Sequence, residues 1–205
     1  MVGHRETEVK LAVADAARAR SLLERHGFRR CGPRMLQSDV VFDTARHRLR
    51  RSGALLRLRR SGSRAWATYK GPASPGRHKS REELELPLKG CEVAAFEQLL
   101  GRLGFRPTFR YEKYRTEFTR PSEPGVIALD ETPIGVYLEL EGPADWIDRT
   151  ASGLGFQPRD YITATYADLY LKHCRRLGHK PVDMLFKSSQ QAAPAPEACR
   201  SHSAG

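Results

Sequence analysis

The sequence lacks the features of secreted, membrane-spanning and disulfide-stabilised proteins. Its 205 residues contain four cysteines, Cys31, Cys91, Cys174 and Cys199, and no Cys-x-x-Cys pair. This spacing suits neither a disulfide framework nor a structural zinc site. No run of eighteen apolar residues is present, which excludes a membrane-spanning helix, and no apolar signal segment opens the chain. We therefore expect a protein of the reducing cytoplasm.

Familiar nucleotide-binding and hydrolase motifs are also missing. There is no Walker loop, no Rossmann glycine fingerprint and no nucleophile elbow. Positive charge, in contrast, is abundant, because 35 Lys and Arg residues outnumber 24 Asp and Glu residues to give a net charge of +11. Such an excess favours an anionic partner: nucleic acid, anionic lipid or a phosphorylated small molecule.

Composition predicts one folded domain over residues 1–187 and a disordered tail over residues 188–205. The hydrophobic fraction of 40% and the chain length suffice for a sizeable core. The last residues are small, polar and proline-containing, so they cannot bury enough apolar surface to offset the entropy of ordering.

A weak repeat indicates where the helices lie. Three times a Glu-x-Glu segment leads into a helical pattern that ends in Gly-Phe, at Gly27, Gly104 and Gly155. Glycine suits the left-handed position that follows a helix. The first helix is expected to begin after Asp15, a good N-cap. Helical spacing predicts that the second presents one apolar face, made of Val93, Phe96, Leu100 and Leu103.

The rest of the chain reads as short strands separated by turn residues, which favours an antiparallel sheet or a closed barrel. Charged residues two apart recur on these strands, and such residues share one face of a strand. The acidic pairs are Glu6 with Glu8, Glu83 with Glu85, and Glu139 with Glu141; the basic pairs are Arg57 with Arg59 and Lys113 with Arg115; Lys10, Lys70 and Asp130 stand in similar segments.

A sheet with one solvated face would show the same alternation for purely structural reasons. Acidic and basic pairs fall on different strands, however, so each strand is expected to present charge of one sign, unlike a mixed soluble surface. If the apolar faces pack on outer helices, the charged faces point into the barrel. Carboxylates there suit a hard divalent cation, and Arg and Lys suit phosphate oxygens. A metal–polyphosphate complex satisfies both sets.

These segments, in this order, resemble the CYTH family, the triphosphate tunnel metalloenzymes, which unites class IV adenylyl cyclases, thiamine triphosphatases and inorganic tripolyphosphatases. The resemblance runs from about residue 4 to about residue 172. It rests on ETEVK, DVVFDT, LLRLRR, YKGP, EELELP, EKYRTEF, LDE, IGVYLELEG and TYADLYL. It implies an α+β fold, an eight-stranded antiparallel β-barrel with outer helices.

The resemblance also implies the roles of the charged residues, with Mg²⁺ or Mn²⁺ as the cofactor. Glu6, Glu8 and Lys10 are the expected catalytic residues. The metal-binding set is Glu6, Glu8, Asp130, Glu139 and Glu141; the phosphate-binding set is Lys10, Arg57, Arg59, Lys70, Lys113 and Arg115; Glu83 and Glu85 are further tunnel acids.

We expect metal-dependent hydrolysis of inorganic tripolyphosphate, a nucleoside triphosphate or thiamine triphosphate. The first alternative is a class IV adenylyl cyclase; these tend to carry His-Phe before the first strand, where this chain has His4 and Arg5. The second is a non-catalytic polyphosphate or nucleotide binder, for which paired glutamates would be a disadvantage. The expected partner is a small triphosphate; a membrane is not expected, nucleic acid is disfavoured and a homodimer is left open. Trp66 and Trp146 offer rings for a base or thiazole, although a packing role is the simpler interpretation.

Overall fold

The computed structural model describes residues 4–187, so the expected tail lies outside the described residues. The strands are β1 (His4–Val13), β2 (Arg29–Arg30), β3 (Met35–Thr44), β4 (Leu55–Ser61), β5 (Arg64–Lys70), β6 (Lys79–Lys89), β7 (Phe105–Thr119), β8 (Val126–Thr132) and β9 (Gly135–Glu141). The helices are α1 (Ala16–Arg25), α2 (Arg48–Arg51), α3 (Val93–Arg102), α4 (Ala144–Gly153) and α5 (Tyr166–Leu177), with 3₁₀ turns at Gly90–Glu92 and Pro158–Asp160.

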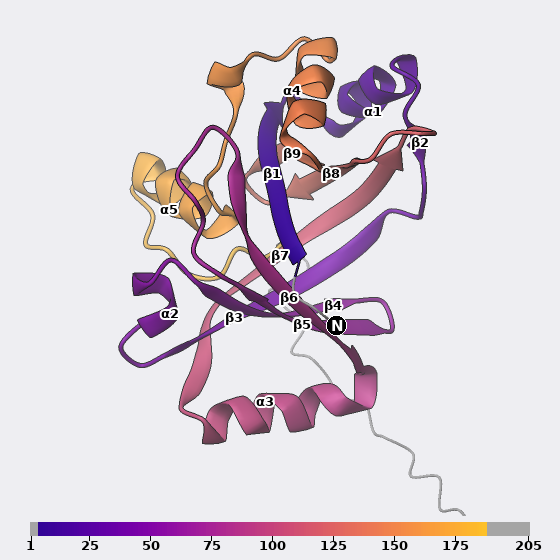
Figure 1. Cartoon of the computed structure of the whole chain (residues 1–205). Helices are drawn as coiled ribbons and strands as arrows, with labels where there is room; N and C mark the ends of the chain where they lie inside the picture. Colours follow the sequence, from indigo (N-terminus) through magenta and orange to yellow (C-terminus); the bar gives the residue numbers. More distant parts are fainter. Residues whose placement is uncertain (1–3, 188–205) are drawn as a thin grey trace, which may run out of the picture.

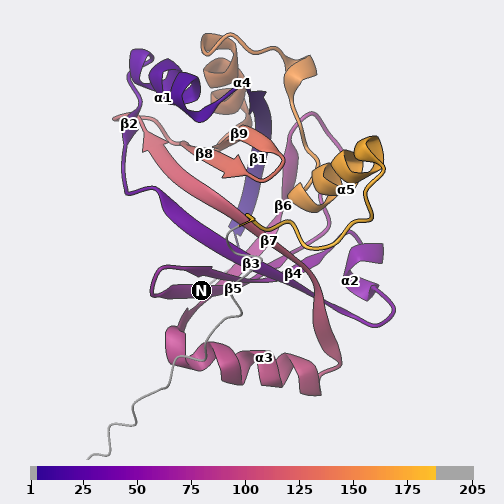
Figure 2. The same ribbon diagram turned by 180° about the vertical axis from the view of Figure 1, so that it is seen from behind.

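Eight of the strands form a closed antiparallel barrel, as predicted. The order around it is β7-β3-β4-β5-β6-β1-β9-β8, and β8 pairs back onto β7. Closure depends on the length of β7, whose 15 residues pair with β3 along most of the strand and with β8 along its last part. The two-residue β2 pairs only with the end of β7 and is an addition to the barrel. Figures 1 and 2 show the barrel from opposite sides.

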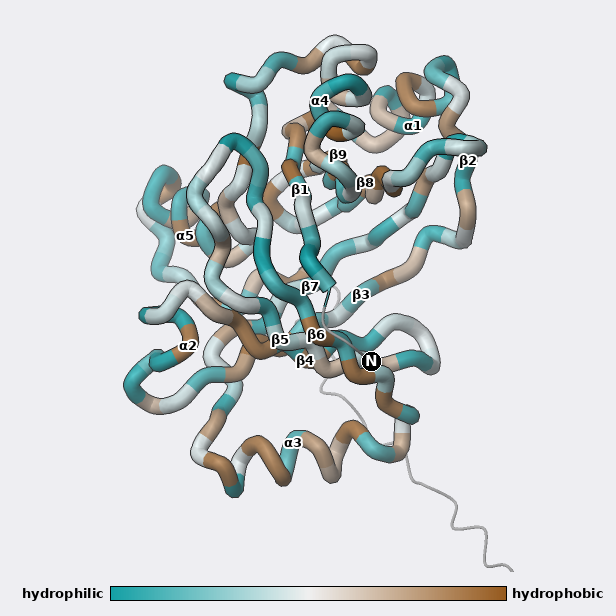
Figure 3. The backbone as a smooth tube through the Cα atoms, in the orientation of Figure 1, coloured by the Kyte–Doolittle hydropathy of each residue, from teal (hydrophilic) through white to brown (hydrophobic). Residues whose placement is uncertain are grey.

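Helices cover two outer faces of the barrel. On one face, α1 and α4 lie beside each other over β1, β8 and β9, and Leu23, Trp146 and Ile147 join an apolar cluster with the strand residues (Figure 1). On another face, Val93 and Leu100 of α3 pack against β3 and β4. Hydrophobic and hydrophilic residues alternate along α3, as an amphipathic helix requires (Figure 3). The charged strand faces are thereby left for the interior.

The ends of the helices follow the sequence signals closely. Asp15 caps α1, and its side chain accepts a hydrogen bond from the backbone N–H of Arg18 at 2.8 Å. Gly27, with φ +79°, takes the left-handed conformation just past the helix. The expectation for Leu103 is wrong, because α3 ends at Arg102 and Leu103 is 63% exposed.

The helix α5 lies across one end of the barrel instead of an outer face. Thr165 and Asp168 form a capping box at its start, which places Tyr166 in the first turn. The preceding segment is tied to β1 by two backbone hydrogen bonds of 2.9 Å between Lys10 and Ile162. Within residues 4–187, none of the helices has the length and apolar character that crossing a membrane requires.

Candidate functional site

The interior of the barrel is a charged cavity of about 320 Å³. This volume lies within the range of small-ligand pockets. Eight Lys and Arg side chains and seven Glu side chains line it, so its charges nearly balance. Twelve of the thirteen predicted site residues line this one cavity: Glu6, Glu8, Lys10, Arg57, Arg59, Lys70, Glu83, Glu85, Lys113, Arg115, Glu139 and Glu141.

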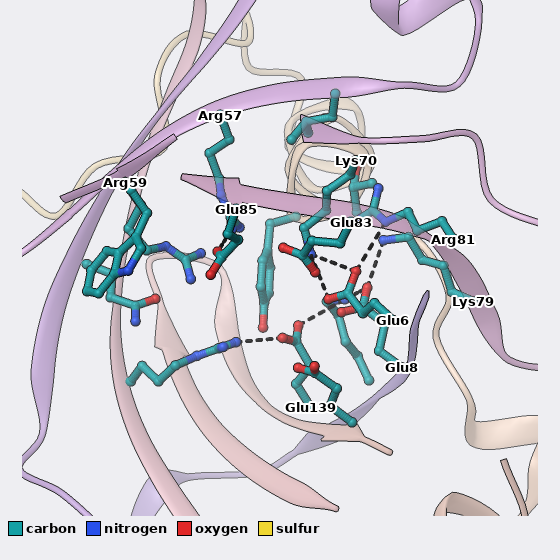
Figure 4. A pocket seen from close by; sticks show the side chains of 18 of the residues that line it. Glu6, Glu8, Arg57, Arg59, Lys70, Lys79, Arg81, Glu83, Glu85 and Glu139 are labelled. Atoms are coloured by element: carbon teal, nitrogen blue, oxygen red, sulfur yellow. Dashed lines mark hydrogen bonds and ion pairs between the residues drawn. The ribbon is translucent and has the colours of Figure 1, made fainter. Parts of the chain in front are cut away.

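On one wall of the cavity, carboxylates from β1 and β6 form ion pairs with a lysine from β5 (Figure 4). The ammonium of Lys70 lies 2.6 Å from a carboxylate oxygen of Glu6 and 3.0 Å from one of Glu83. Arg81 also contacts Glu6, at 3.4 Å. These side chains meet because the strand order places β6 between β1 and β5.

A second group links β1 to β9. Lys10 lies 3.0 Å from Glu8 and 3.0 Å from Glu139, its direct partner on β9. Lys79 approaches Glu8 at 2.8 Å. Burial opposes ionisation of Glu8, but Lys10 and Lys79 hold its pKa well below its ordinary value. The pKa of Glu139 is likewise lowered, against its burial, by Lys10 and Arg115.

The basic wall is held by two carboxylates that are fully buried. Asp39 on β3 accepts from the guanidinium of Arg59 at 2.8 Å and lies 3.4 Å from Arg57. Figure 4 shows Arg57 and Arg59 on the side of the cavity opposite Glu6 and Lys79. Because Asp39 orients both guanidinium groups, their positions are set before any ligand binds.

The second of these buried carboxylates, Asp130, orients Lys113 and Arg115 and does not itself line the cavity. Its carboxylate lies 2.8 Å from Lys113 and 2.7 Å from Arg115, and it accepts a hydrogen bond from the Tyr166 hydroxyl at 2.7 Å. Burial opposes ionisation of Asp130, but Arg115 and Lys113 lower its pKa. The geometry shows Asp130 orienting cations from behind the cavity wall, and its role as a metal ligand stays a prediction.

The acidic residues at the junction of β1 and β9 repel one another. Glu141 stands opposite Glu8, and no ion pair involves it within the described chain. Burial, followed by the charges of Glu6 and Glu139, raises the pKa of Glu141 to about 7. Burial and the nearby Glu8 also raise the pKa of Glu6. A cation placed among these carboxylates would relieve the repulsion.

Sequence reasoning missed Lys79 and Arg81, which line the cavity beside Glu83. The signal was present, because the two-residue alternation of Glu83 and Glu85 continues backwards through both residues. The expectation that each strand presents one sign of charge is therefore wrong for β6. Burial and the neighbouring Lys10 and Arg81 lower the pKa of Lys79 to about 8, although Glu8 opposes this shift.

The donor set fits a hard divalent cation in chemical type. Such cations prefer carboxylate oxygens, and Glu6, Glu8, Glu139 and Glu141 supply them around one junction. Across residues 4–187, no three such side chains already converge on a common point. The reason is visible in the ion pairs, since Lys10 and Lys70 occupy the carboxylates that a metal would bind.

Fold and cavity together define a closed antiparallel barrel whose interior is built from opposed acidic and basic side chains. The CYTH domain matches residues 4–151, and the chain belongs to this family. It is 28% identical over 136 residues to a protein of Methanocaldococcus jannaschii named as a putative adenylate cyclase, a match covering 66% of this chain and 75% of that protein.

Solved structures share the fold. A Vibrio parahaemolyticus protein described as a putative adenylate cyclase has a TM-score of 0.70 at 16% identity, covering 82% of this chain and 98% of its own. A Hippeastrum protein, described as a putative adenylyl cyclase that reveals a dominant triphosphatase activity, has a TM-score of 0.58 at 18% identity, covering 86% and 97%.

Proposed function

We propose that this protein is a divalent-metal-dependent triphosphatase that hydrolyses a triphosphate held in the barrel cavity. One observation carries the proposal: four glutamates that repel one another face, across one cavity, cationic side chains that are already oriented by Asp39 and Asp130. The glutamates are Glu6, Glu8, Glu139 and Glu141. A triphosphate alone would add several negative charges to a cavity whose charges already nearly balance. Divalent cations bound with it would restore the balance.

The chain's own residues would do most of the binding. Arg57, Arg59, Lys113 and Arg115 would contact phosphate oxygens, for which guanidinium groups offer paired donors. The glutamates would hold Mg²⁺ or Mn²⁺, which when bound neutralises charge on the phosphate oxygens. The Arg and Lys side chains would also stabilise the charge that develops on the transferred phosphoryl group.

The atoms exchanged in hydrolysis come only from water and the bound triphosphate. The water oxygen forms a bond to the terminal phosphorus, and the bond from that phosphorus to the bridging oxygen breaks. Phosphate and the shortened chain leave, while a cavity carboxylate accepts the proton from water. The dominant triphosphatase activity in the description of the Hippeastrum protein supports this choice.

Adenylyl cyclase activity is the second candidate. It is favoured by the names of the Methanocaldococcus jannaschii and Vibrio parahaemolyticus proteins. In that reaction the 3′-hydroxyl of ATP attacks the α-phosphorus and pyrophosphate leaves. The same cation set would serve, so the products must be measured separately.

Two substitutions of opposite sign test the proposal. Glu8→Gln keeps the shape of the side chain and removes a metal-facing charge, so turnover is expected to fall about a hundredfold or more. Metal-free triphosphate binding should hold or improve. Arg57→Ala should instead weaken binding itself, by roughly 1.5–3 kcal/mol. Glu24→Gln and Arg20→Ala, on the exposed surface of α1, are the matched controls.

The assay measures phosphate, pyrophosphate and cyclic AMP separately from tripolyphosphate, ATP, GTP and thiamine triphosphate. Cyclic AMP with pyrophosphate would assign the cyclase. A folded wild-type protein that binds triphosphate tightly without metal, and turns over none of these substrates, would identify a binding module.

A further inference from the structure

Trp66 is an apolar ring placed among the charged side chains of the cavity. It comes from β5, is half-buried, lines the cavity and joins none of the three apolar clusters of residues 4–187. Trp146 differs, because it is 1% exposed and packs in the core beneath α4. Core packing therefore explains Trp146 and leaves Trp66 without a packing role.

The register places Trp66 next to the expected phosphate site. Trp66 is the direct partner of Arg59 across the β4–β5 pair. Side chains of directly opposed residues start about 4.5–5.5 Å apart, so the ring flanks the guanidinium that Asp39 holds. Any organic group attached to a phosphate at Arg59 would thus lie within reach of the ring.

Gln37 provides an unused polar group in the same cavity. It lies on β3 directly opposite Lys113, another expected phosphate ligand, and is 9% exposed. Its side-chain carbonyl oxygen is buried and has no hydrogen-bond partner. Leaving a buried acceptor unpaired costs free energy, so this amide is suited to a ligand that brings a donor. The edge of a nucleobase carries donors and acceptors that a glutamine amide can match.

We propose that Trp66 and Gln37 form a nucleobase subsite, which makes the substrate a nucleoside triphosphate. The base stacks on Trp66 and presents its edge to Gln37, while the phosphates extend from Arg59 and Lys113 towards the glutamates. Trp66 lies beside Arg59 and Gln37 lies beside Lys113, and both cations are expected to bind phosphate. The base and the nearest phosphate are therefore held by neighbouring strands. This inference rests on the proposed function, because it assigns the substrate of the same cavity.

The test compares Trp66→Ala, Trp66→Phe and Gln37→Leu with the wild type on ATP, tripolyphosphate and thiamine triphosphate. The quantity compared is the ratio of kcat/KM for ATP to that for tripolyphosphate. Loss of one base-stacking contact corresponds to about 5- to 150-fold in affinity. Trp66→Ala is expected to lower the ratio by that factor, Trp66→Phe by much less, and Gln37→Leu by about tenfold.

A binding measurement checks the subsite without turnover. The chain has two tryptophans, so Trp66→Phe leaves Trp146 as the remaining fluorophore. ATP should quench the fluorescence of the wild type and not that of Trp66→Phe, and tripolyphosphate should quench neither. An adequately folded Trp66→Phe protein keeps this comparison valid even if Trp66→Ala is unstable.

The outcomes separate the subsite from the triphosphatase. If the wild type hydrolyses triphosphates but Trp66→Ala leaves the ratio unchanged, the subsite is refuted and the proposed function stands. A selective loss on thiamine triphosphate instead of ATP also refutes it. If the wild type turns over no triphosphate, the proposed function fails, and quenching by ATP that requires Trp66 would still support the subsite.

Discussion

Replacing Asp130 by Asn tests whether this carboxylate orients cations or binds metal. The substitution keeps the size of the side chain but removes the charge that Lys113 and Arg115 share. It also turns an oxygen acceptor into an NH₂ group that faces donors, including the Tyr166 hydroxyl. The cations on this side of the barrel would then be buried with reduced compensation, and Arg115 would depend on Glu139 alone.

The expected loss of stability is large. Removing one partner of a buried ion pair costs about 3–5 kcal/mol, and Asp130 is fully buried with both Lys113 and Arg115 as partners. For a domain of this size that corresponds to a Tm lower by roughly 6–20 °C. Urea unfolding and thermal unfolding, both followed by circular dichroism, measure the change. The exposed pair of Asp145 and Arg149 provides the control, since Asp145→Asn should leave the stability nearly unchanged.

Tyr166→Phe dissects the same cluster, because it removes one hydrogen bond and keeps the charge of Asp130. It is expected to cost about 1.5–3 kcal/mol. The reasoning is refuted if Asp130→Asn unfolds like the wild type while the metal concentration needed for half-maximal turnover rises. That result would support the metal-binding role that the family resemblance implies for Asp130.

Three further outcomes are expected. EDTA should abolish phosphate release, and Mg²⁺ or Mn²⁺ should restore it while Ca²⁺ does so poorly; undiminished hydrolysis without metal would contradict the role of the glutamates. Lys79 and Lys113 both have a pKa lowered to about 8, Lys113 by burial and then by Arg115, so each loses its charge as the pH rises above 7. Triphosphate affinity measured by calorimetry should therefore fall between pH 7 and pH 9, and Lys79→Arg should lessen this fall without removing it. Gly125→Ala would place a Cβ 2.3 Å from the Trp146 ring and should cost about 1–3 kcal/mol in urea unfolding, whereas Gly153→Ala, with open space around it, should not destabilise.

Local signals in the sequence predicted much of the fold. Asp15 starts α1 because its carboxylate satisfies a free backbone N–H, and Gly27 ends it because a residue there needs a positive φ. The two-residue alternation of Glu6 and Glu8 predicted their common face because side-chain direction in a strand depends only on the backbone of that strand. These are properties of neighbouring residues, so a sequence displays them directly.

The sequence does not show directly which strands pair with each other. Asp39 and Asp130 are both aspartates on strands, and both hold cations instead of lining the cavity, since their partners come from β4 and β7. Lys79 and Arg81 continue the two-residue alternation of Glu83 and Glu85, but only the pairing of β6 with β1 brings them onto Glu8 and Glu6.

The sequence by itself therefore determined which residues carry charge, which face of each strand they occupy and where several helices begin and end. Tertiary structure alone decided which carboxylate meets which cation, that Tyr166 of α5 reaches Asp130, and that Glu141 keeps no cation partner among residues 4–187. The physical reason is the separation along the chain over which each property is determined. Side-chain direction is set within a few residues, whereas burial, ion pairing and the resulting pKa values depend on strand order, register and closure of the barrel.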